Sequence, residues 1–252
     1  HADRLVRRQG PGRGGPDHEG GTTGIGASIC ESLIAAGYDV ATNYIANKDQ
    51  ANAFAKETGV SVYQWDVSDF DQCEQGVKKI CADFGTNVEI LVNNVGITRN
   101  HMMHKRTQED WDTVIAVDLG ACFNMSRVVI EAMREKEFGR IISISSINAQ
   151  LGQVGQTNYS AVNTGVIGFT TSLARESASK NITVNTIAPG YTDRVMVQTR
   201  PDKALQAMIA QVPVGRLAQP EETTRAVVWI ASDDAGFITG QTFSVNGGLY
   251  TQ

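Results

Sequence analysis

The spacing of hydrophobic positions changes repeatedly along the chain from Tyr38 onward. Short runs rich in β-branched residues alternate with longer amphipathic segments, and these two patterns are typical of strands and helices. The predicted strands are 38–44, 60–67, 88–96, 140–146, 182–190 and 241–248. The predicted helices are 25–37, 48–59, 69–85, 107–139, 158–180 and 220–232. This alternation predicts a single α/β domain, a Rossmann-like, doubly wound parallel sheet flanked by helices.

Several polar residues mark where the predicted elements end. Thr107 precedes the longest helix as a candidate N-cap, and Glu109 and Asp110 follow in its first turn. Gly59 closes the helix that begins near Lys48. The run 88–96 is apolar almost throughout, as expected for a strand that is buried on both faces.

The first nineteen residues break the pattern. They are rich in Gly, Pro and Arg, and their only apolar pair is Leu5-Val6. Composition alone indicates a flexible basic arm, a tag or a tail. We therefore divide the chain into an atypical arm at 1–19, in the position of the first strand, and a domain at 20–252. A GC-rich reading frame read out of register is a further hypothesis for this arm.

Composition limits the classes of partner. The chain has 252 residues, 41% of them hydrophobic, and a net charge of −5, which argues against nucleic acid or an anionic membrane as a partner. No apolar run reaches the roughly 20 residues that span a bilayer. Cys30, Cys73, Cys81 and Cys122 are widely spaced, so we expect reduced thiols and a cytoplasmic location.

Glycines introduce the first well-patterned helix. Gly20, Gly24 and Gly26, with Ile25 between the last two, have the spacing G-x-x-x-G-x-G. Glycines at such spacing let backbone amides approach a pyrophosphate at the positive end of a helix. A strand should lead into this loop, but the residues upstream are a poor strand sequence. The first strand is therefore either formed by a poor sequence or absent.

From Gly20 to Gly248 the chain resembles the short-chain dehydrogenase/reductases in the order and spacing of its motifs. The matching motifs are the glycine loop, "WDVSD" (65–69), "LVNNVG" (91–96), "ISISS" (142–146), Tyr159, "APG" (188–190) and "FITGQTFSVNGG" (237–248). Within the family, the loop before Tyr159 looks most like that of the acetoacetyl-CoA reductases of polyhydroxybutyrate synthesis, followed by the 3-oxoacyl-[acyl-carrier-protein] reductases. The resemblance implies NADPH-dependent reduction of a 3-oxoacyl thioester to the (R)-3-hydroxyacyl thioester by a homotetramer.

The resemblance also implies roles for individual residues. Ser146 and Tyr159 stand at the positions of the family's catalytic serine and tyrosine. The alternative interpretation is that Ser146 merely ends a strand and that Tyr159 packs in the core. A tyrosine can protonate the alkoxide left by hydride transfer if a neighbouring positive charge lowers its pKa, and a nearby hydroxyl can bond the same oxygen. Gln150, Gln153 and Gln156 would face a thioester, or they form a solvated polar loop.

Cofactor positions follow from the same resemblance. The glycine loop would line the pyrophosphate, and the remaining positions would line the adenine, ribose and nicotinamide: Asp66, Val67, Asn93, Val95, Gly96, Pro189, Gly190 and Thr192. Asp66 has a second interpretation as a helix N-cap. No acidic residue closes the strand 38–44, where it would bind a ribose 2′-OH. Asn43, Tyr44 and Lys48 suit a 2′-phosphate better, so we expect NADP rather than NAD.

Two departures from the family pattern fall at catalytic positions. Asn163 replaces the lysine that lowers the tyrosine pKa in the family, and it brings no charge. Asp118 replaces an asparagine, and its negative charge is expected to oppose a phenolate. We therefore expect impaired activity. The alternatives are a non-catalytic nucleotide-binding or assembly member of the family, or a reductase of another small ketone.

The segment that contains His101 and His104 offers two potential metal ligands. The two imidazoles are three residues apart and could share a helix face, but no carboxylate or third ligand is evident. We expect a surface or lid segment there and no metal.

Overall fold

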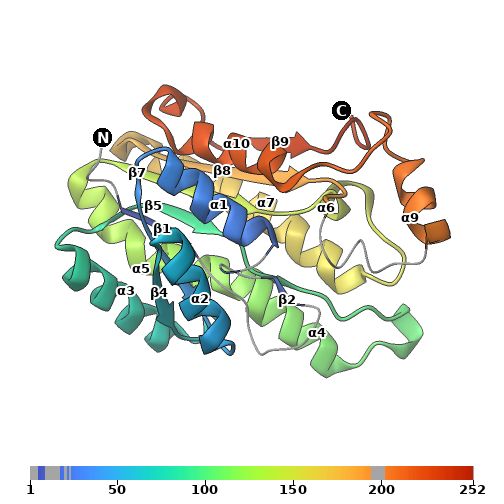
Figure 1. Cartoon of the computed structure of the whole chain (residues 1–252), viewed down its shortest axis with the longest axis horizontal. Helices are drawn as coiled ribbons and strands as arrows, with labels where there is room; N and C mark the ends of the chain where they lie inside the picture. Colours follow the sequence, from blue (N-terminus) through green and yellow to red (C-terminus); the bar gives the residue numbers. More distant parts are fainter. Residues whose placement is uncertain (1–4, 9–17, 20–21, 23, 194–201, 252) are drawn as a thin grey trace.

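The computed structural model describes residues 5–8, 18–19, 22, 24–193 and 202–251. These residues form a seven-stranded sheet in the order β4-β3-β1-β5-β7-β8-β9, and every neighbouring pair is parallel. The strands are β1 (Leu5–Arg8), β3 (Asp39–Tyr44), β4 (Ser61–Gln64), β5 (Val88–Asn93), β7 (Gly139–Ile144), β8 (Ile182–Pro189) and β9 (Thr242–Val245). The Rossmann-like doubly wound sheet predicted from the sequence is confirmed (Figure 1).

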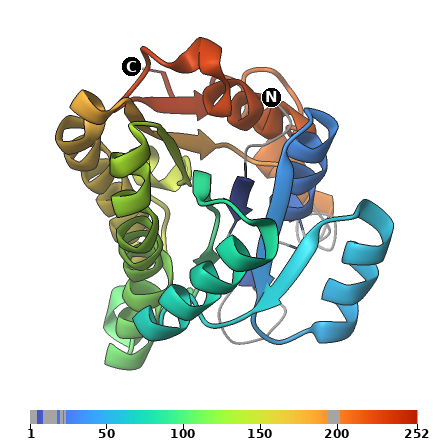
Figure 2. The same ribbon diagram turned by 90° about the vertical axis from the view of Figure 1, so that its left-hand side faces the viewer.

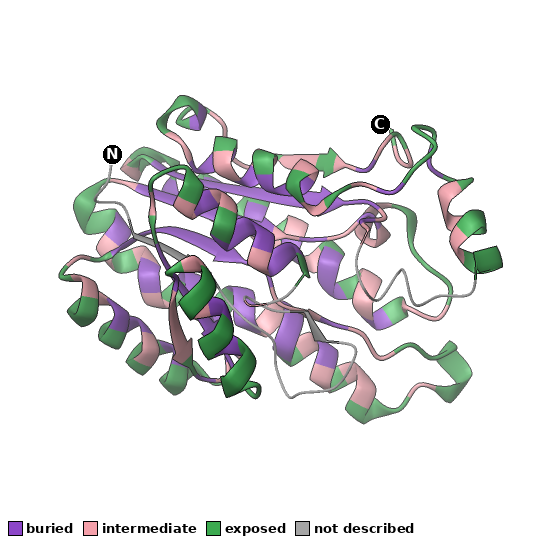
Figure 3. Ribbon diagram, in the orientation of Figure 1, coloured by how far each residue is buried: buried purple, intermediate pink, exposed green. Residues whose placement is uncertain are grey.

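Helices cover both faces of this sheet (Figure 2). One face carries α1 (Gly24–Ala35), α2 (Lys48–Thr58) and α10 (Pro220–Ala231), and the other carries α3 (Phe70–Phe84), α5 (Ala121–Lys136) and α7 (Thr157–Ser177). Successive residues of a strand point to opposite faces of the sheet. Ile90 and Val92 therefore pack under α1, α2 and α10, and Leu91 packs under α3, α5 and α7. Burial on both faces explains the continuous apolar run of β5 and its full burial (Figure 3).

The first strand is present despite its poor sequence. Leu5–Arg8 lies in the middle of the sheet, paired with β3 on one side and β5 on the other. Backbone hydrogen bonds on two sides hold a central strand whatever its side chains. The expectation of a flexible arm is therefore wrong for these four residues. A second short strand, β2 (His18–Glu19), pairs antiparallel with β6 (Gly96–Ile97), which places Glu19 opposite Gly96.

The predicted helix at 107–139 is continuous but changes pitch. It consists of α4 (Gln108–Val114), the π-helical turn η2 (Ile115–Gly120) and α5. Thr107 and Asp110 form a capping box at its start, so the predicted N-cap is confirmed. By length and composition Gln108–Lys136 could cross a membrane, but half of its most apolar window is buried inside the protein. It packs against the sheet, as a core helix does.

Two helices were missed in segments that the sequence indicated as loops. They are α6 (Asn148–Leu151), before the tyrosine helix, and α9 (Asp202–Ile209), before α10. Short 3₁₀ turns are η1 (Met103–Lys105), η3 (Ala178–Lys180) and η4 (Asp233–Ala235). Both helices are short enough that hydrophobic periodicity gives little signal.

Candidate active site

The candidate catalytic residues gather at the carboxyl edge of the sheet. Asn93 ends β5, Ser146 lies two residues beyond β7, and Pro189 ends β8. The order β3-β1-β5 means that the chain turns to opposite sides of the sheet after β1 and after β5. Crevices outside the carboxyl ends of strands at such a switch point are where open α/β sheets bind ligands.

Ser146 and Tyr159 meet at this edge. The Ser146 hydroxyl accepts a hydrogen bond from the Asn148 N–H at 3.2 Å, which fixes the side chain at the turn into α6. It also acts to lower the pKa of the Tyr159 phenol, which lies beside it. Tyr159 lies in the first turn of α7, so α7 brings the phenol to a serine thirteen residues away in the chain.

The electrostatic balance at Tyr159 nevertheless favours the neutral phenol. Loss of water around the ring is the largest cause that raises the pKa of Tyr159 to about 12, and Asp118 adds to the rise whenever it is ionised. Ser146 and Asn163 oppose it only through neutral hydrogen bonds. Among the described residues, no lysine or arginine contributes to lowering this pKa.

Asn163 lies one helical turn after Tyr159, at the position where the family has a lysine. Its side chain is buried and donates to the Tyr159 backbone carbonyl at 2.8 Å, within the helix. The Ser145 hydroxyl donates to the Asn163 carbonyl at 3.0 Å and joins α7 to the end of β7. Asn163 therefore supports the geometry of the site but brings no positive charge to it.

Asp118 lies behind the tyrosine, on the π-helical turn. The side chain is 4% exposed, and its Oδ1 accepts the Ile97 N–H at 2.9 Å. Burial raises the pKa of Asp118 well above its usual range, while the Ile97 N–H and Arg99 act in the opposite direction. The expectation of a fixed negative charge here needs correction, because an aspartate buried this deeply favours its neutral form.

Two residues that the sequence did not reveal hold the tyrosine helix in place. Asn158 is fully buried, and its amide donates to the carbonyls of Arg99 and Asp110. The Arg106 guanidinium donates to the Thr157 hydroxyl and to the carbonyls of Arg99, His101 and Gly155. In the sequence, the signal that could have indicated this role of Asn158 is its polar side chain directly before Tyr159.

The described part of the glycine loop fits a dinucleotide phosphate. Gly24 begins α1 at a φ of 56°, which favours glycine, and no acidic residue lies in the first turn. The N-terminal end of this helix carries a partial positive charge and free N–H groups. Ile25 is buried in the core beneath the loop, and Gly26 is buried beside it. Gly20 lies outside the described residues.

Of the residues predicted to contact adenine and ribose, some are buried and one, Asp66, is hydrogen-bonded to a residue of its own loop. Val67 and Asn93 are buried; the Asn93 amide donates to the Ser143 hydroxyl, and Val95 packs in the core below. Asp66 accepts from both the N–H and the hydroxyl of Ser68. The helix N-cap of α3 is Asp69, so the alternative interpretation of Asp66 as that cap is wrong.

Asn43 does not face a cofactor phosphate with its side chain. It is fully buried, and its amide donates to the Trp65 carbonyl at 3.2 Å. Tyr44 is buried as well, whereas Lys48 is exposed at the start of α2. Of the three residues suggested for the 2′-phosphate, Lys48 alone presents its charged group at the surface.

Residues after β8 border the other side of the crevice. A Cβ on Gly190 would lie 2.7 Å from Asn246 Cα, so a glycine is required for this close approach. Thr192 is buried, and its hydroxyl donates to the Gly190 carbonyl. On the facing side, a Cβ on Gly96 would lie 3.9 Å from the Tyr159 ring, so the backbone at Gly96 borders the tyrosine directly.

Comparison with known proteins identifies the family of this chain. Residues 20–250 match the family described as "Enoyl-(Acyl carrier protein) reductase". The chain belongs to the short-chain dehydrogenase/reductases. An acetoacetyl-CoA reductase of Rhizobium meliloti is 54% identical over 232 residues, 92% of this chain and 96% of the relative. One of Shinella zoogloeoides is 52% identical over the same shares, and a 3-oxoacyl-[acyl-carrier-protein] reductase of Escherichia coli is 41% identical over 92% and 95%.

The three glutamines of this short-chain reductase, Gln150, Gln153 and Gln156, differ in what their side chains contact. Gln150 exchanges hydrogen bonds with the Ser244 hydroxyl of β9, and Gln156 accepts from the Asn148 amide at 2.8 Å. Both of these side chains hold the loop together. Gln153 is exposed, so it is the member of the trio with a side chain free to meet a ligand.

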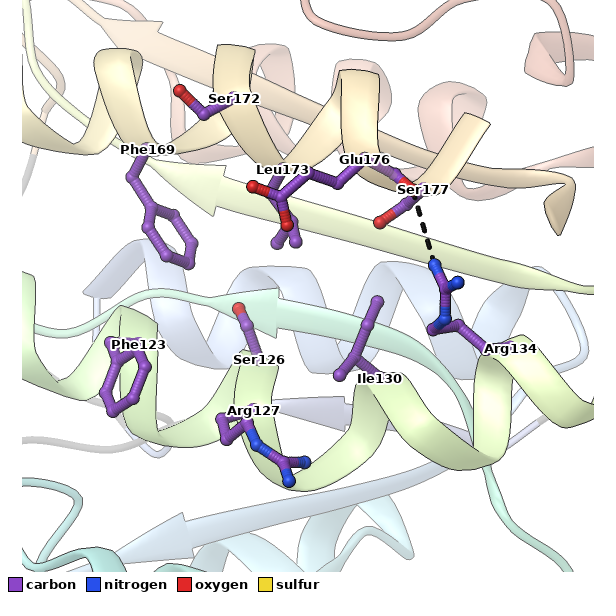
Figure 4. Close-up of a pocket in the computed structure, with 10 residues that line it drawn as sticks. All are labelled: Phe123, Ser126, Arg127, Ile130, Arg134, Phe169, Ser172, Leu173, Glu176 and Ser177. Carbon is purple, nitrogen blue, oxygen red and sulfur yellow. Dashed lines mark hydrogen bonds between the residues drawn. The ribbon is translucent and has the colours of Figure 1, made fainter. Parts of the chain in front are cut away.

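The histidines and the large surface groove lie apart from this chemistry. His101 Nε2 is 3.8 Å from the Asp110 carboxylate, and no group of three potential metal ligands occurs among the described residues. A groove between α5 and α7 is lined by residues such as Phe123, Ile130 and Phe169 (Figure 4). It contains neither Ser146 nor Tyr159.

Proposed function

We propose that this protein reduces a 3-oxoacyl thioester of the acetoacetyl-CoA type to the (R)-3-hydroxyacyl thioester with NADPH, at a rate lowered by Asn163. The observation that carries the proposal is the position of the Ser146 hydroxyl beside the Tyr159 phenol at the carboxyl edge of the sheet, where it acts to lower the pKa of the tyrosine. Relatives named acetoacetyl-CoA reductase and 3-oxoacyl-[acyl-carrier-protein] reductase cover more than nine-tenths of the chain and support the substrate class.

The residues of the site fit a ketone oxygen between two hydroxyls. A bound NADPH supplies the hydride that this reaction requires. Ser146 donates a hydrogen bond to the ketone oxygen as negative charge develops there. Tyr159 donates its phenolic proton to the same oxygen, which becomes the alcohol. Asn158 keeps the tyrosine at this position through its hydrogen bond to the Arg99 carbonyl outside α7, and Asn163 through its hydrogen bond to the Tyr159 carbonyl within α7.

A slow reaction is expected rather than an absent one. With a pKa of about 12, Tyr159 carries its proton at neutral pH and can still protonate a more basic alkoxide. The phenolate that remains is poorly stabilised, because none of the described cations offsets it. General acid–base assistance contributes on the order of 10²–10⁴-fold, so much of this factor depends on the missing charge.

The surroundings of the site suit an acyl thioester. Four large apolar side chains are exposed in the two segments next to the site: Met102, Met103, Leu151 and Val154. The His101 N–H donates to the Gly155 carbonyl and joins these segments beside the start of α7. An acyl chain could pack on this rim while the exposed Gln153 amide bonds a polar carrier arm.

An assay of NADPH consumption tests the reduction. Acetoacetyl-CoA and acetoacetyl-acyl-carrier protein are compared, with crotonyl-CoA included because the matched family is described as an enoyl reductase. We expect turnover with a ketone substrate, a product of R configuration, and loss of activity in Tyr159→Phe and Ser146→Ala. Activity that survives Tyr159→Phe would contradict the mechanism.

The neutral surroundings of Tyr159 favour a second candidate, a non-catalytic member that binds nucleotide. Its distinguishing result is tight NADPH binding with no turnover of any substrate in the wild-type protein. NADPH and NADH titrations come first, and we infer a preference for NADPH because Lys48 is exposed near the end of β3. Absence of binding to either dinucleotide would refute both candidates.

We also infer a homotetramer in the cytoplasm. The α5–α7 groove carries apolar side chains together with Arg127, Arg134 and Glu176, so a twofold partner could match cations with carboxylates (Figure 4). None of the four cysteines is part of a disulfide, which fits a reducing compartment. Phe123→Glu should dissociate the assembly in light scattering after gel filtration. Phe237→Glu, at a phenylalanine that is fully exposed and lies outside this groove, is the control and should leave it intact.

A further inference from the structure

We propose that Asp118 is held as a neutral carboxylic acid in the folded protein. The protonation state is a property of the fold alone, whereas its effect on catalysis rests on the proposed reduction. The neutral acid would remove from the site the negative charge that opposes a phenolate at Tyr159. It would make the reductase sensitive to pH at a residue that does not touch the ketone.

The geometry at the two carboxyl oxygens supports this proposal. Oδ1 accepts one hydrogen bond, from the Ile97 N–H at 2.9 Å. Oδ2 is buried and has no hydrogen-bond partner among the described residues. A carboxylate with one N–H for two oxygens is poorly compensated in a site that excludes water. Protonation at Oδ2 removes the charge and converts this oxygen from an unsatisfied acceptor into a donor.

The groups that pack against Asp118 offer little to an anion. On α7, Tyr159 has a pKa of about 12 and is neutral. On α5, burial raises the pKa of the Cys122 thiol to about 12, and this thiol donates to the Asp118 backbone carbonyl instead. After β6, Arg99 attracts a negative charge at Asp118, but its guanidinium donates to the Thr98 carbonyl at 3.0 Å.

The acidic groups of α4, which also packs against the π-helical turn, point elsewhere. Glu109 is exposed, Asp110 accepts from Thr107 in the capping box, and Asp112 accepts from Gln108. No cation from α4 approaches Asp118 in the described structure. Of all the charged groups on these elements, Arg99 alone favours the carboxylate, and burial outweighs it as the larger cause.

The first test measures unfolding by urea as a function of pH in wild type and Asp118→Asn. A folded state that retains a proton which the unfolded chain releases loses stability as pH rises above about 4, the ordinary aspartate value. The unfolding constant of wild type, divided by that of Asp118→Asn, should rise about tenfold per pH unit up to the folded-state pKa. A ratio that stays flat or falls between about pH 5 and 8 overturns the proposal.

Asp110→Asn is the matched control because its carboxylate is the favoured form. Hydrogen bonding by Thr107 lowers the pKa of Asp110, so its contribution is lost as pH falls rather than as it rises. Between about pH 5 and 8 the Asp110→Asn ratio should therefore stay flat, and it should change in the opposite direction to that of Asp118→Asn only below about pH 4. If Asp118→Asn does not fold, Asp118→Ser retains an acceptor for the Ile97 N–H and replaces it in the comparison.

Infrared spectroscopy gives a second readout that needs no activity. Wild-type protein labelled with ¹³C at aspartate side chains should show the C=O stretch of a buried protonated carboxyl at pH 7, and Asp118→Asn should lack it. Absence of this band in wild type overturns the assignment even if the protein is an active reductase. If the band is present and no substrate turns over, the proposed function fails while the assignment stands.

Discussion

Restoring the missing charge at Asn163 is the sharpest test of why Tyr159 is a poor acid. Asn163 lies one turn beyond the tyrosine and is buried beside it, so a lysine there would place its ammonium near the phenol. At an effective dielectric constant of about 20, unit charges about 4–6 Å apart attract by about 3–4 kcal/mol. At 1.36 kcal/mol per pKa unit, this corresponds to a fall of roughly 2–3 in the pKa of Tyr159.

Starting from a pKa of about 12, this fall brings Tyr159 to roughly 9–10. The phenolate formed in the reaction is stabilised by the same factor, so we expect kcat to rise about 10²–10³-fold in Asn163→Lys. Burial of the ammonium offsets part of the gain, and the lower end of this range is the better expectation. KM for the thioester should change little, because Asn163 is buried and its amide donates within α7, to the Tyr159 carbonyl.

The assay is steady-state NADPH oxidation with acetoacetyl-CoA, run after NADPH titration has shown that each variant binds the cofactor. Asn163→Met is the matched control, since methionine has nearly the length of lysine without its charge. Tyr159→Phe in the Asn163→Lys background should abolish the gain. A rise in Asn163→Met equal to that in Asn163→Lys would refute the electrostatic reasoning, as would a gain that persists without the phenol.

Three further predictions concern packing, thiols and the cofactor. Gly190→Ala should lower the free energy of unfolding by about 1–3 kcal/mol in urea titrations, because its Cβ would lie 2.7 Å from Asn246 Cα. Gly168→Ala in α7 meets nothing within 4 Å and should instead stabilise by up to about 1 kcal/mol; equal losses in both variants would contradict the packing argument. In native protein, iodoacetamide should label Cys81 before the three buried cysteines, as peptide mass mapping can check. Lys48→Glu should weaken NADPH about tenfold or more in binding titrations and leave NADH nearly unchanged; equal weakening of both would remove Lys48 from the 2′-phosphate.

Sequence predicted the parts of the site that depend on local pattern and parallel topology. The alternation of strands and helices placed Ser146 at the carboxyl end of a strand and Tyr159 at the start of the next long helix. A parallel sheet brings such positions to one edge, so their encounter follows from the order of elements. The capping box at Thr107 and the glycine end of α2 were also readable, because each involves only neighbours in the chain.

The remaining features depend on contacts between distant segments. β1 is held by the backbones of β3 and β5, so its side chains carry almost no signal. The state of Asp118 is set by α5, α7 and the Ile97 N–H, none of which its own sequence neighbourhood reveals. Gln150 and Gln153 look alike in sequence, yet the first is bonded to Ser244 and the second is exposed.

The π-helical turn at 115–120 should let the long helix accept the loss of one residue, which a regular α-helix would not. A π turn accommodates one residue more than the α-helical geometry around it. Deleting one residue within 115–120 could therefore restore regular α-helix while α4 and α5 keep nearly the same relative orientation, because the wider turn absorbs the extra residue. The consequence would be local: the side chains within 115–120, Asp118 among them, would change position, whereas the α4 cap and the α5 core face would stay in place.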